Sequence, residues 1–214
     1  MKSNLVPRII AGCAFLVYFF FTLLVDLIFY TTYGNIDVKT IIYYMIYFIG
    51  LTLLAVSLFI DFRILSAAGC GICIVRYLPG LVESIQYYLQ SNSDPDLYGK
   101  ISFLETGIIS FLLIILTFAL LFFSCLFKKA SLFLGIGAAV SAFLIIVMVI
   151  IRNLIFSYGF AIGNYADFFA LLFLITGCIT MGIAYSREKI KKMPVQNQNY
   201  RYQPDRPYRP DQRW

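Results

Sequence analysis

The sequence has no histidine and little charge of either sign. Of its 214 residues, 13% are charged and 61% are apolar, and the mean hydropathy is +0.83. A soluble domain carries roughly 25% charged and 45–50% apolar residues, so this chain has too few polar groups to cover a globule in water. The composition excludes a cytosolic enzyme, a disordered protein and a secreted disulfide scaffold. It predicts an integral membrane protein.

The absence of histidine also limits the chemistry. It removes the commonest general base near neutral pH and the commonest zinc or haem ligand. Cys70 and Cys73 have the spacing of a redox or metal motif, but they lie in an apolar run with no second pair, so we expect them to pack as small apolar residues. We therefore expect no enzyme activity, no cofactor and no metal site. An enzyme would have to use Glu83 or Glu105 as its acid or base.

Six apolar runs are long enough to cross a membrane, which takes about 20 residues of helix. None shows the alternating polarity of strands in a membrane barrel. The predicted fold is therefore all-α, a polytopic membrane helix bundle with six transmembrane helices in a domain of residues 1–185. The predicted spans are 9–30, 41–60, 64–90, 101–127, 131–151 and 168–185.

The start of the sixth span is left open by the sequence. The segment 154–166 is apolar and aromatic, and it is interrupted by Gly159 and Gly163. It fits a loop on the outer leaflet, a re-entrant lid or the first part of a broken sixth helix, since irregular backbone is tolerated in a membrane where it lines a cavity.

Basic residues beside the spans predict the orientation. Short flanks rich in Lys and Arg are retained in the cytoplasm. Arg8 precedes the first span, Lys128 and Lys129 follow the fourth, and the tail after the sixth is strongly basic. The pattern predicts cytoplasmic N- and C-termini in a cell membrane. The lack of N-glycosylation sequons fits a bacterial protein.

The tail 186–214 differs from the rest of the chain. It has eight basic and three acidic residues, and so carries +5 of the net charge of +6. It is rich in proline and poor in aliphatic residues, which predicts disorder. Four basic residues beside the membrane are expected to contact anionic lipid headgroups, each worth about 1 kcal/mol; they are Arg187, Lys189, Lys191 and Lys192. The alternative is that residues 200–214 dock a protein partner. No nucleic acid is expected.

Charged residues inside the spans, or directly beside their outer ends, are the candidate ligand-binding residues. A charge near the bilayer centre costs at least about 2.5–3.5 kcal/mol and usually faces protein or water. Arg76 is the deepest, about 18 Å along a helix that starts at Ile64. All six candidates fall in the predicted outward half: Asp26, Arg76, Glu83, Glu105, Arg152 and Asp167. This segregation predicts an outward-facing polar cavity.

Alternatives to a ligand role stand beside this prediction. Arg76 fits a structural ion pair with Glu83 or Glu105 that joins the third span to the fourth, or a side chain that extends to the interface. The other five candidates fit solvated helix ends.

Small residues four apart predict close helix packing, because they let backbones approach in lipid. They occur at Ala67 and Gly71, at Ser131, Gly135 and Ala139, and at Cys178 and Gly182. Packing within one chain is the expectation, and a homodimer through the fifth span is the alternative.

Two functions remain. The first is a small-solute transporter, or the membrane-embedded substrate-binding subunit of one, that takes a small polar or anionic solute from outside. In its number of spans and the position of its ends, the chain broadly resembles the substrate-binding components of energy-coupling-factor vitamin transporters, although no residue motif carries that resemblance. The second is a non-catalytic membrane scaffold or assembly protein that docks partners through its basic tail.

Overall fold

The computed structural model describes residues 5–33, 38–90, 104–155 and 162–187. These residues form helices and contain no strand. The six long helices are α1 (Leu5–Tyr33), α2 (Val38–Ile60), α3 (Arg63–Gln90), α5 (Ser110–Leu126), α6 (Ser131–Ile155) and α7 (Ile162–Ser186). A π-helical turn, η3 (Leu104–Ile109), leads into α5, and a 3-10 turn, η4 (Lys128–Ala130), joins α5 to α6. All six long helices contain a stretch apolar enough to cross a membrane, which confirms the predicted fold class.

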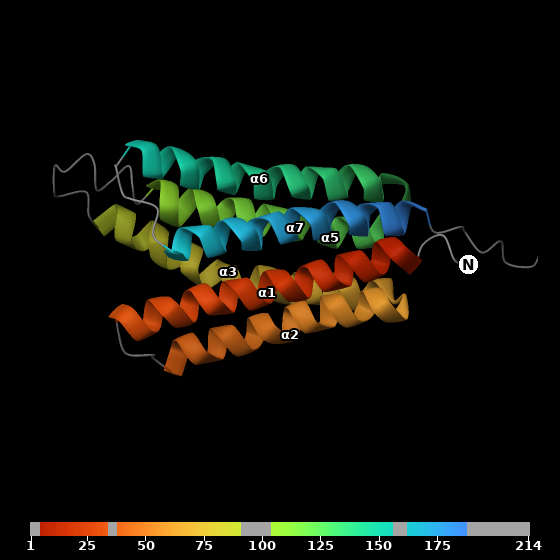
Figure 1. Ribbon diagram of the computed structural model, residues 1–214, viewed down its shortest axis with the longest axis horizontal. Coiled ribbons are helices and arrows are strands. Elements are labelled where there is room, and N and C mark those ends of the chain that lie inside the picture. The colour runs from red at the N-terminus through yellow and green to blue at the C-terminus, as the bar shows by residue number, and fades with distance from the viewer. Residues whose placement is uncertain (1–4, 34–37, 91–103, 156–161, 188–214) are drawn as a thin grey trace, which may run out of the picture.

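The helices lie side by side along one long axis (Figure 1). Each packs mainly against its neighbours in the chain, and α7 returns to pack against α1, so the bundle closes into a ring. The start of α1, the α2–α3 turn, the α5–α6 turn and the end of α7 share one end of the bundle, which we name the terminal end. At the opposite end, which we name the long-loop end, α1, α3 and α6 end and α2 and α7 begin.

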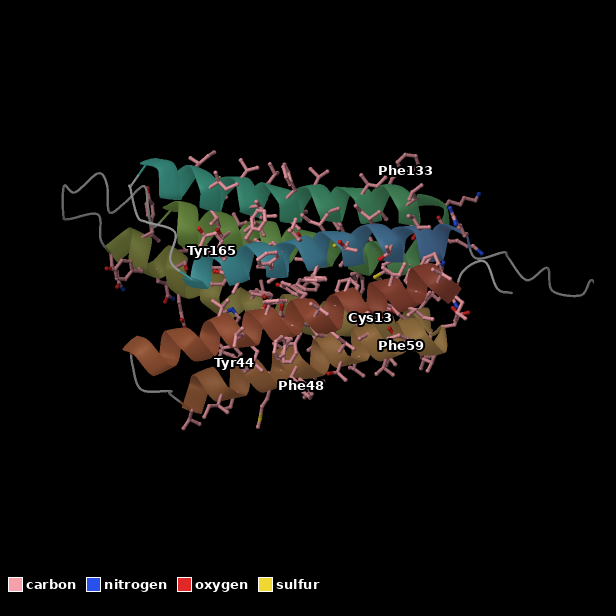
Figure 2. All side chains as sticks on the ribbon, viewed as in Figure 1. Cys13, Tyr44, Phe48, Phe59, Phe133 and Tyr165 are labelled. Carbon is pink, nitrogen blue, oxygen red and sulfur yellow. The ribbon has the colours of Figure 1, made fainter. Side chains whose placement is uncertain are left out.

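The outer surface of the bundle is apolar. Large side chains point away from its axis on several helices, among them Phe48, Phe59 and Phe133 (Figure 2). Phe133 is 76% exposed and Ile64 is 71% exposed. Soluble monomers rarely expose contiguous apolar patches larger than a few hundred Å². The surface is the kind that lipid tails cover, as in a multi-pass membrane protein.

The helix bounds settle part of what the sequence left open. The third span was predicted within one residue at its start. The sixth span was predicted to start at residue 168, but α7 starts at Ile162, so residues 162–166 belong to the helix. Residues 154 and 155 end α6, and 156–161 lie outside the described residues. Residues 162–166 are thus the first part of the sixth helix, as one alternative expected, but α7 is continuous from Ile162 to Ser186 and not broken.

The small residues of α6 and α7 make the predicted close contact. A Cβ built on Gly135 would lie 2.8 Å from the carbonyl oxygen of Cys178 and 2.8 Å from the Cα of Gly182. Only a residue without a side chain fits there. The predicted close packing within one chain is confirmed at Gly135 and Gly182, and the structure shows that these two residues face each other.

The prediction for α3 was wrong at Gly71. A Cβ on Gly71 would meet nothing within 4 Å. The close contact falls on Gly69, whose added Cβ would lie 2.7 Å from the carbonyl oxygen of Gly50 in α2. Residues two apart lie on nearly opposite sides of a helix, so spacing alone did not identify the face that meets a neighbour.

Candidate ligand-binding site

A pocket of about 270 Å³ lies inside the ring, in the half toward the long-loop end. Ser110 is the first residue of α5, and Asp167 lies in the second turn of α7, so the pocket reaches the long-loop ends of these helices. Five helices contribute to the wall: α1 provides Tyr18 and Thr22, α3 Tyr77, α5 Ser110, Phe111 and Ile114, α6 Ile145, Met148 and Val149, and α7 Asp167, Ala170 and Leu171. Such convergence of an apolar wall with a few polar groups is typical of small-molecule sites.

Aromatic rings lie behind the pocket toward the terminal end. Tyr18 and Tyr77 line it, and the Tyr47 ring packs edge-on against both, with centroid distances of 6.4 Å and 5.5 Å. Phe118 stacks on Tyr77 at 6.2 Å. Tyr18, Tyr47 and Phe118 are buried, so this layer separates the pocket from the core of the terminal half.

A second cavity, of about 300 Å³ and shallow and open to the surface, lies beside the first at α3. It is lined by Gly80, Glu83, Ser84, Tyr87 and Phe111. The ring of Phe111 lines both cavities, and it fits because position 80 has no side chain: a Cβ there would lie 2.8 Å from the Phe111 Cζ. Gly80 therefore sets the position of the ring between the cavities.

The structure divides the six candidate residues. Asp167 lines the pocket, and Glu83 lines the second cavity. Arg76 lines neither. Asp26, Glu105 and Arg152 lie in helical backbone, but their side chains are outside the described part of the chain.

Arg76 faces tyrosine rings. Its guanidinium carbon lies 5.0 Å from the ring centroid of Tyr43 and 5.7 Å from that of Tyr44, both in α2, and 5.7 Å from that of Tyr77. The face of an aromatic ring attracts a cation at such distances. The described contacts of the Arg76 guanidinium are thus with aromatic rings, and the expected ion pair with Glu83 or Glu105 stays a prediction, since the Glu105 side chain lies outside the described residues.

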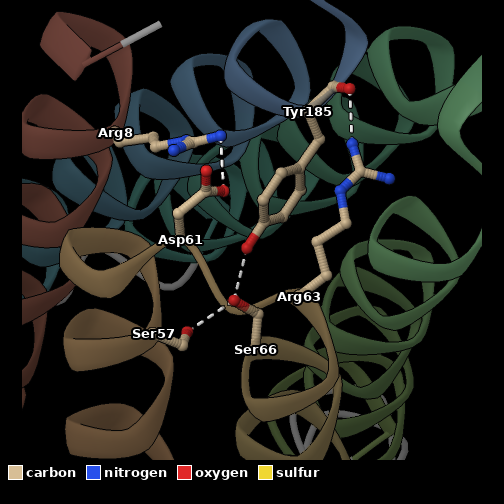
Figure 3. A network of polar contacts seen from close by, with 6 residues as sticks. All are labelled: Arg8, Ser57, Asp61, Arg63, Ser66 and Tyr185. Carbon is tan, nitrogen blue, oxygen red and sulfur yellow. Dashed lines mark hydrogen bonds and ion pairs between the residues drawn. The ribbon is translucent and has the colours of Figure 1, made fainter. Parts of the chain in front are cut away.

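Polar side chains tie the helices together at the terminal end (Figure 3). The Arg8 Nη2 lies 2.5 Å from the Asp61 Oδ1, which joins α1 to the α2–α3 turn. Arg63, at the start of α3, donates a hydrogen bond of 2.5 Å to the carbonyl oxygen of Tyr185 at the end of α7. The hydroxyl groups of Tyr185, Ser66 and Ser57 form a chain of hydrogen bonds. We name this set the terminal network.

The α5–α6 turn is tied to the same helix end. The hydroxyls of Ser124 and Ser131 lie 2.9 Å apart, and Ser131 donates to the carbonyl oxygen of Gly182 at 3.3 Å. Both turns of the terminal end are thus attached to the last turn of α7. The sequence showed Arg8 only as a flanking charge, because its pairing with Asp61 joins residues far apart in the chain and leaves no local pattern.

Comparison of the chain with protein-family models, with curated proteins and with solved structures found no match in any of the three. The class of the molecule therefore comes from its own helices, six of which are able to span a membrane. Its function has to be argued from the pocket and from the terminal network.

Proposed function

We propose that this chain is a small-solute transporter, or the membrane-embedded substrate-binding subunit of one, in a cell membrane. The observation that supports the proposal is the difference between the two halves of the bundle. One half holds a pocket lined by five helices, and the other is closed by packed side chains and the terminal network. In this proposal the long-loop end faces outside, as the basic flanks predict.

Alternating access requires this kind of arrangement. A transporter presents a site to one side of the membrane while packing between its helices closes the other side. Hydrogen bonds between membrane helices are worth about 0.6 kcal/mol on average. A closure built from a few such bonds holds the resting state and still opens when the solute favours another arrangement of the helices.

Tryptophan substitution at two neighbouring leucines of α7 tests the proposal. Leu171 is 9% exposed and lines the pocket, whereas Leu172 is 40% exposed on the outside of the bundle. Leu171→Trp fills the pocket, and Leu172→Trp places the same bulk in lipid at the same depth. The full chain in nanodiscs is equilibrated with a defined mixture of amines, amino acids, organic acids and nucleobases, and the retained solutes are counted by mass spectrometry.

We expect the wild type and Leu172→Trp to retain the same solute, and Leu171→Trp to lose it at least tenfold. Retention that is equal in the two variants, or no retention by the wild type, would contradict the proposal. The scaffold alternative predicts a different result in cells: removal of residues 188–214 abolishes the function of the chain, and Leu171→Trp leaves it intact.

A further inference from the structure

We infer that the pocket takes a small aromatic solute with a hydrogen-bond acceptor at one end, such as the oxygen of a ketone or an amide, and that tyrosine hydroxyls bind this acceptor. The hydroxyls belong to Tyr18 of α1, Tyr47 of α2 and Tyr77 of α3, which we name the tyrosine cluster. This inference rests on the proposed function, because it names the class of solute for the same pocket. It depends on hydrogen bonding and shape, and not on the charge of the pocket.

The hydroxyl of Tyr47 is the observation that supports the inference most directly. Tyr47 is 2% exposed, and its hydroxyl has no hydrogen-bond partner in the described part of the chain. Buried polar groups in proteins are nearly always hydrogen-bonded, and one without a partner keeps the cost of its lost hydration. The fold gains nothing from this hydroxyl. A solute that completes the missing bond gives it a function.

The Tyr47 hydroxyl is connected to the pocket through its neighbours. The polar groups around it include the hydroxyls of Tyr18 and Tyr77, and both of these residues line the pocket. A hydroxyl can donate one hydrogen bond and accept others. When Tyr18 or Tyr77 donates to an acceptor in the pocket, its oxygen is left to accept from Tyr47. Hydrogen bonds in such a chain strengthen one another where the dielectric constant is low, so the cluster favours an acceptor over a hydrocarbon.

The rest of the pocket fits an aromatic body. The rings of Tyr77 and Phe111 both line it, with their centroids 6.2 Å apart and their planes tilted by 53°. Aromatic rings pack against one another at such distances. Ile114, Ile145 and Met148 supply apolar wall. A volume of about 270 Å³ corresponds to the share of roughly nine water molecules in the liquid, which limits the solute to roughly ten non-hydrogen atoms.

Acetophenone and α-methylstyrene test the inference, because they have the same shape and differ only in a carbonyl oxygen that a methylene group replaces. Each is titrated calorimetrically into the full chain in nanodiscs, with empty nanodiscs as the blank for partition into lipid. We expect the wild type to bind acetophenone at least tenfold more tightly than α-methylstyrene, because the hydrocarbon leaves buried hydroxyls without a partner.

Substitutions in the tyrosine cluster connect that preference to its hydroxyls. Tyr47→Phe is expected to weaken binding of acetophenone at least threefold, and the double variant Tyr18→Phe, Tyr77→Phe to weaken it to the level of α-methylstyrene. Both are expected to bind α-methylstyrene within twofold of the wild type, which reports an intact pocket. Tyr43→Phe is the matched control. Tyr43 lies one turn before Tyr47, faces Arg76 and is outside the described lining of the pocket, so both probes are expected to bind within twofold.

The outcomes separate this inference from the proposed function. Equal binding of the two probes by the wild type, a preference for α-methylstyrene, or an unchanged preference in Tyr47→Phe or in the double variant overturns the inference and leaves the pocket a binding site. Loss of both probes in Tyr47→Phe also overturns it, because the hydroxyl then does more than bind an acceptor. If neither probe binds to the wild type, the inference is wrong, and the comparison of Leu171→Trp with Leu172→Trp decides whether the pocket binds any solute.

Discussion

Two tyrosine hydroxyls show how differently single polar groups behave in this bundle. Tyr185 is fully buried, and its hydroxyl is hydrogen-bonded to Ser66. Tyr47 is 2% exposed, and its hydroxyl has no hydrogen-bond partner in the described structure. A buried polar atom without a partner keeps its desolvation cost, whereas a paired one recovers it. Equal burial therefore has opposite consequences for stability.

Removing each hydroxyl tests this difference. Tyr185→Phe is expected to lower the free energy of unfolding by about 0.5–1.5 kcal/mol, because it removes one of the two hydrogen bonds that join Tyr185 to α3 and leaves the bond from Arg63 to its carbonyl oxygen. Tyr47→Phe is expected to leave stability unchanged or to raise it, because it removes a hydroxyl that gains nothing in the fold. Thermal unfolding of the two variants in detergent measures both effects. Equal losses in the two variants would show that the hydroxyl of Tyr185 contributes nothing specific.

Arg76 shows what the sequence reveals of a single residue and what it does not. Its position was notable because one arginine interrupts an apolar run, which requires an explanation in a membrane. Its neighbours were not predictable, because Tyr43 and Tyr44 belong to another helix, and the choice between a carboxylate and an aromatic ring depends on how α2 and α3 are rotated. Asp167 was named as a candidate at the edge of the predicted sixth span, a weaker signal than that of Arg76, yet among the candidates with described side chains it lines the pocket.

The helices themselves were predictable because each is a long apolar run. The short connections also followed from the sequence, since the runs at 41–60 and 64–90 leave no room for more than a turn. What spacing could not give is the rotation of each helix about its axis. Ala67 and Gly71 have the right spacing for a close contact, but Gly69 makes it.

Substitutions at three glycines test these helix contacts. Gly135→Ala is expected to lower the free energy of unfolding by about 1–3 kcal/mol, because the new methyl group would meet the backbone of α7, which cannot move aside as a side chain can. Gly69→Ala is expected to act alike against α2. Gly71→Ala is the matched control in α3, since its methyl group meets nothing within 4 Å.

The midpoint of thermal unfolding in detergent measures all three variants. We expect it to fall for Gly135→Ala and Gly69→Ala and to stay level or rise for Gly71→Ala, because alanine also favours a helix more than glycine does. A fall at Gly71 equal to that at Gly69 would mean that the contact between α2 and α3 was placed on the wrong face.

At the scale of the whole molecule, the contact between α7 and α1 closes the ring of helices that forms the wall of the pocket. The first and last helices are the most distant in the sequence, so no pattern within either predicts that they meet. The bonds of the α2–α3 and α5–α6 turns to the last turn of α7 depend on that closure, and they too could not be predicted. The sequence predicted only that these turns lie at the same end.

The placement of the two ends relative to the membrane is the prediction on which the transport proposal depends. The described start of α1 and end of α7 lie at the same end of the bundle (Figure 1), and the basic flanks predict that this end faces the cytoplasm. Fusions of a cytoplasm-active fluorescent protein and of a phosphatase active only outside the cytoplasm report the side of each junction. The reporters are fused to the chain in bacterial cells after residues 61, 128 and 214, to report the side of the terminal end. They are also fused after residues 36, 96 and 158, to report the side of the long-loop end. We expect fluorescence without phosphatase activity at the first three junctions and the reverse at the other three. If the two reporters give the opposite result at all six junctions, the helix bundle is unaffected but its pocket opens to the cytoplasm. The proposal of uptake from outside is then wrong. If they fail to alternate, the six-span topology is wrong.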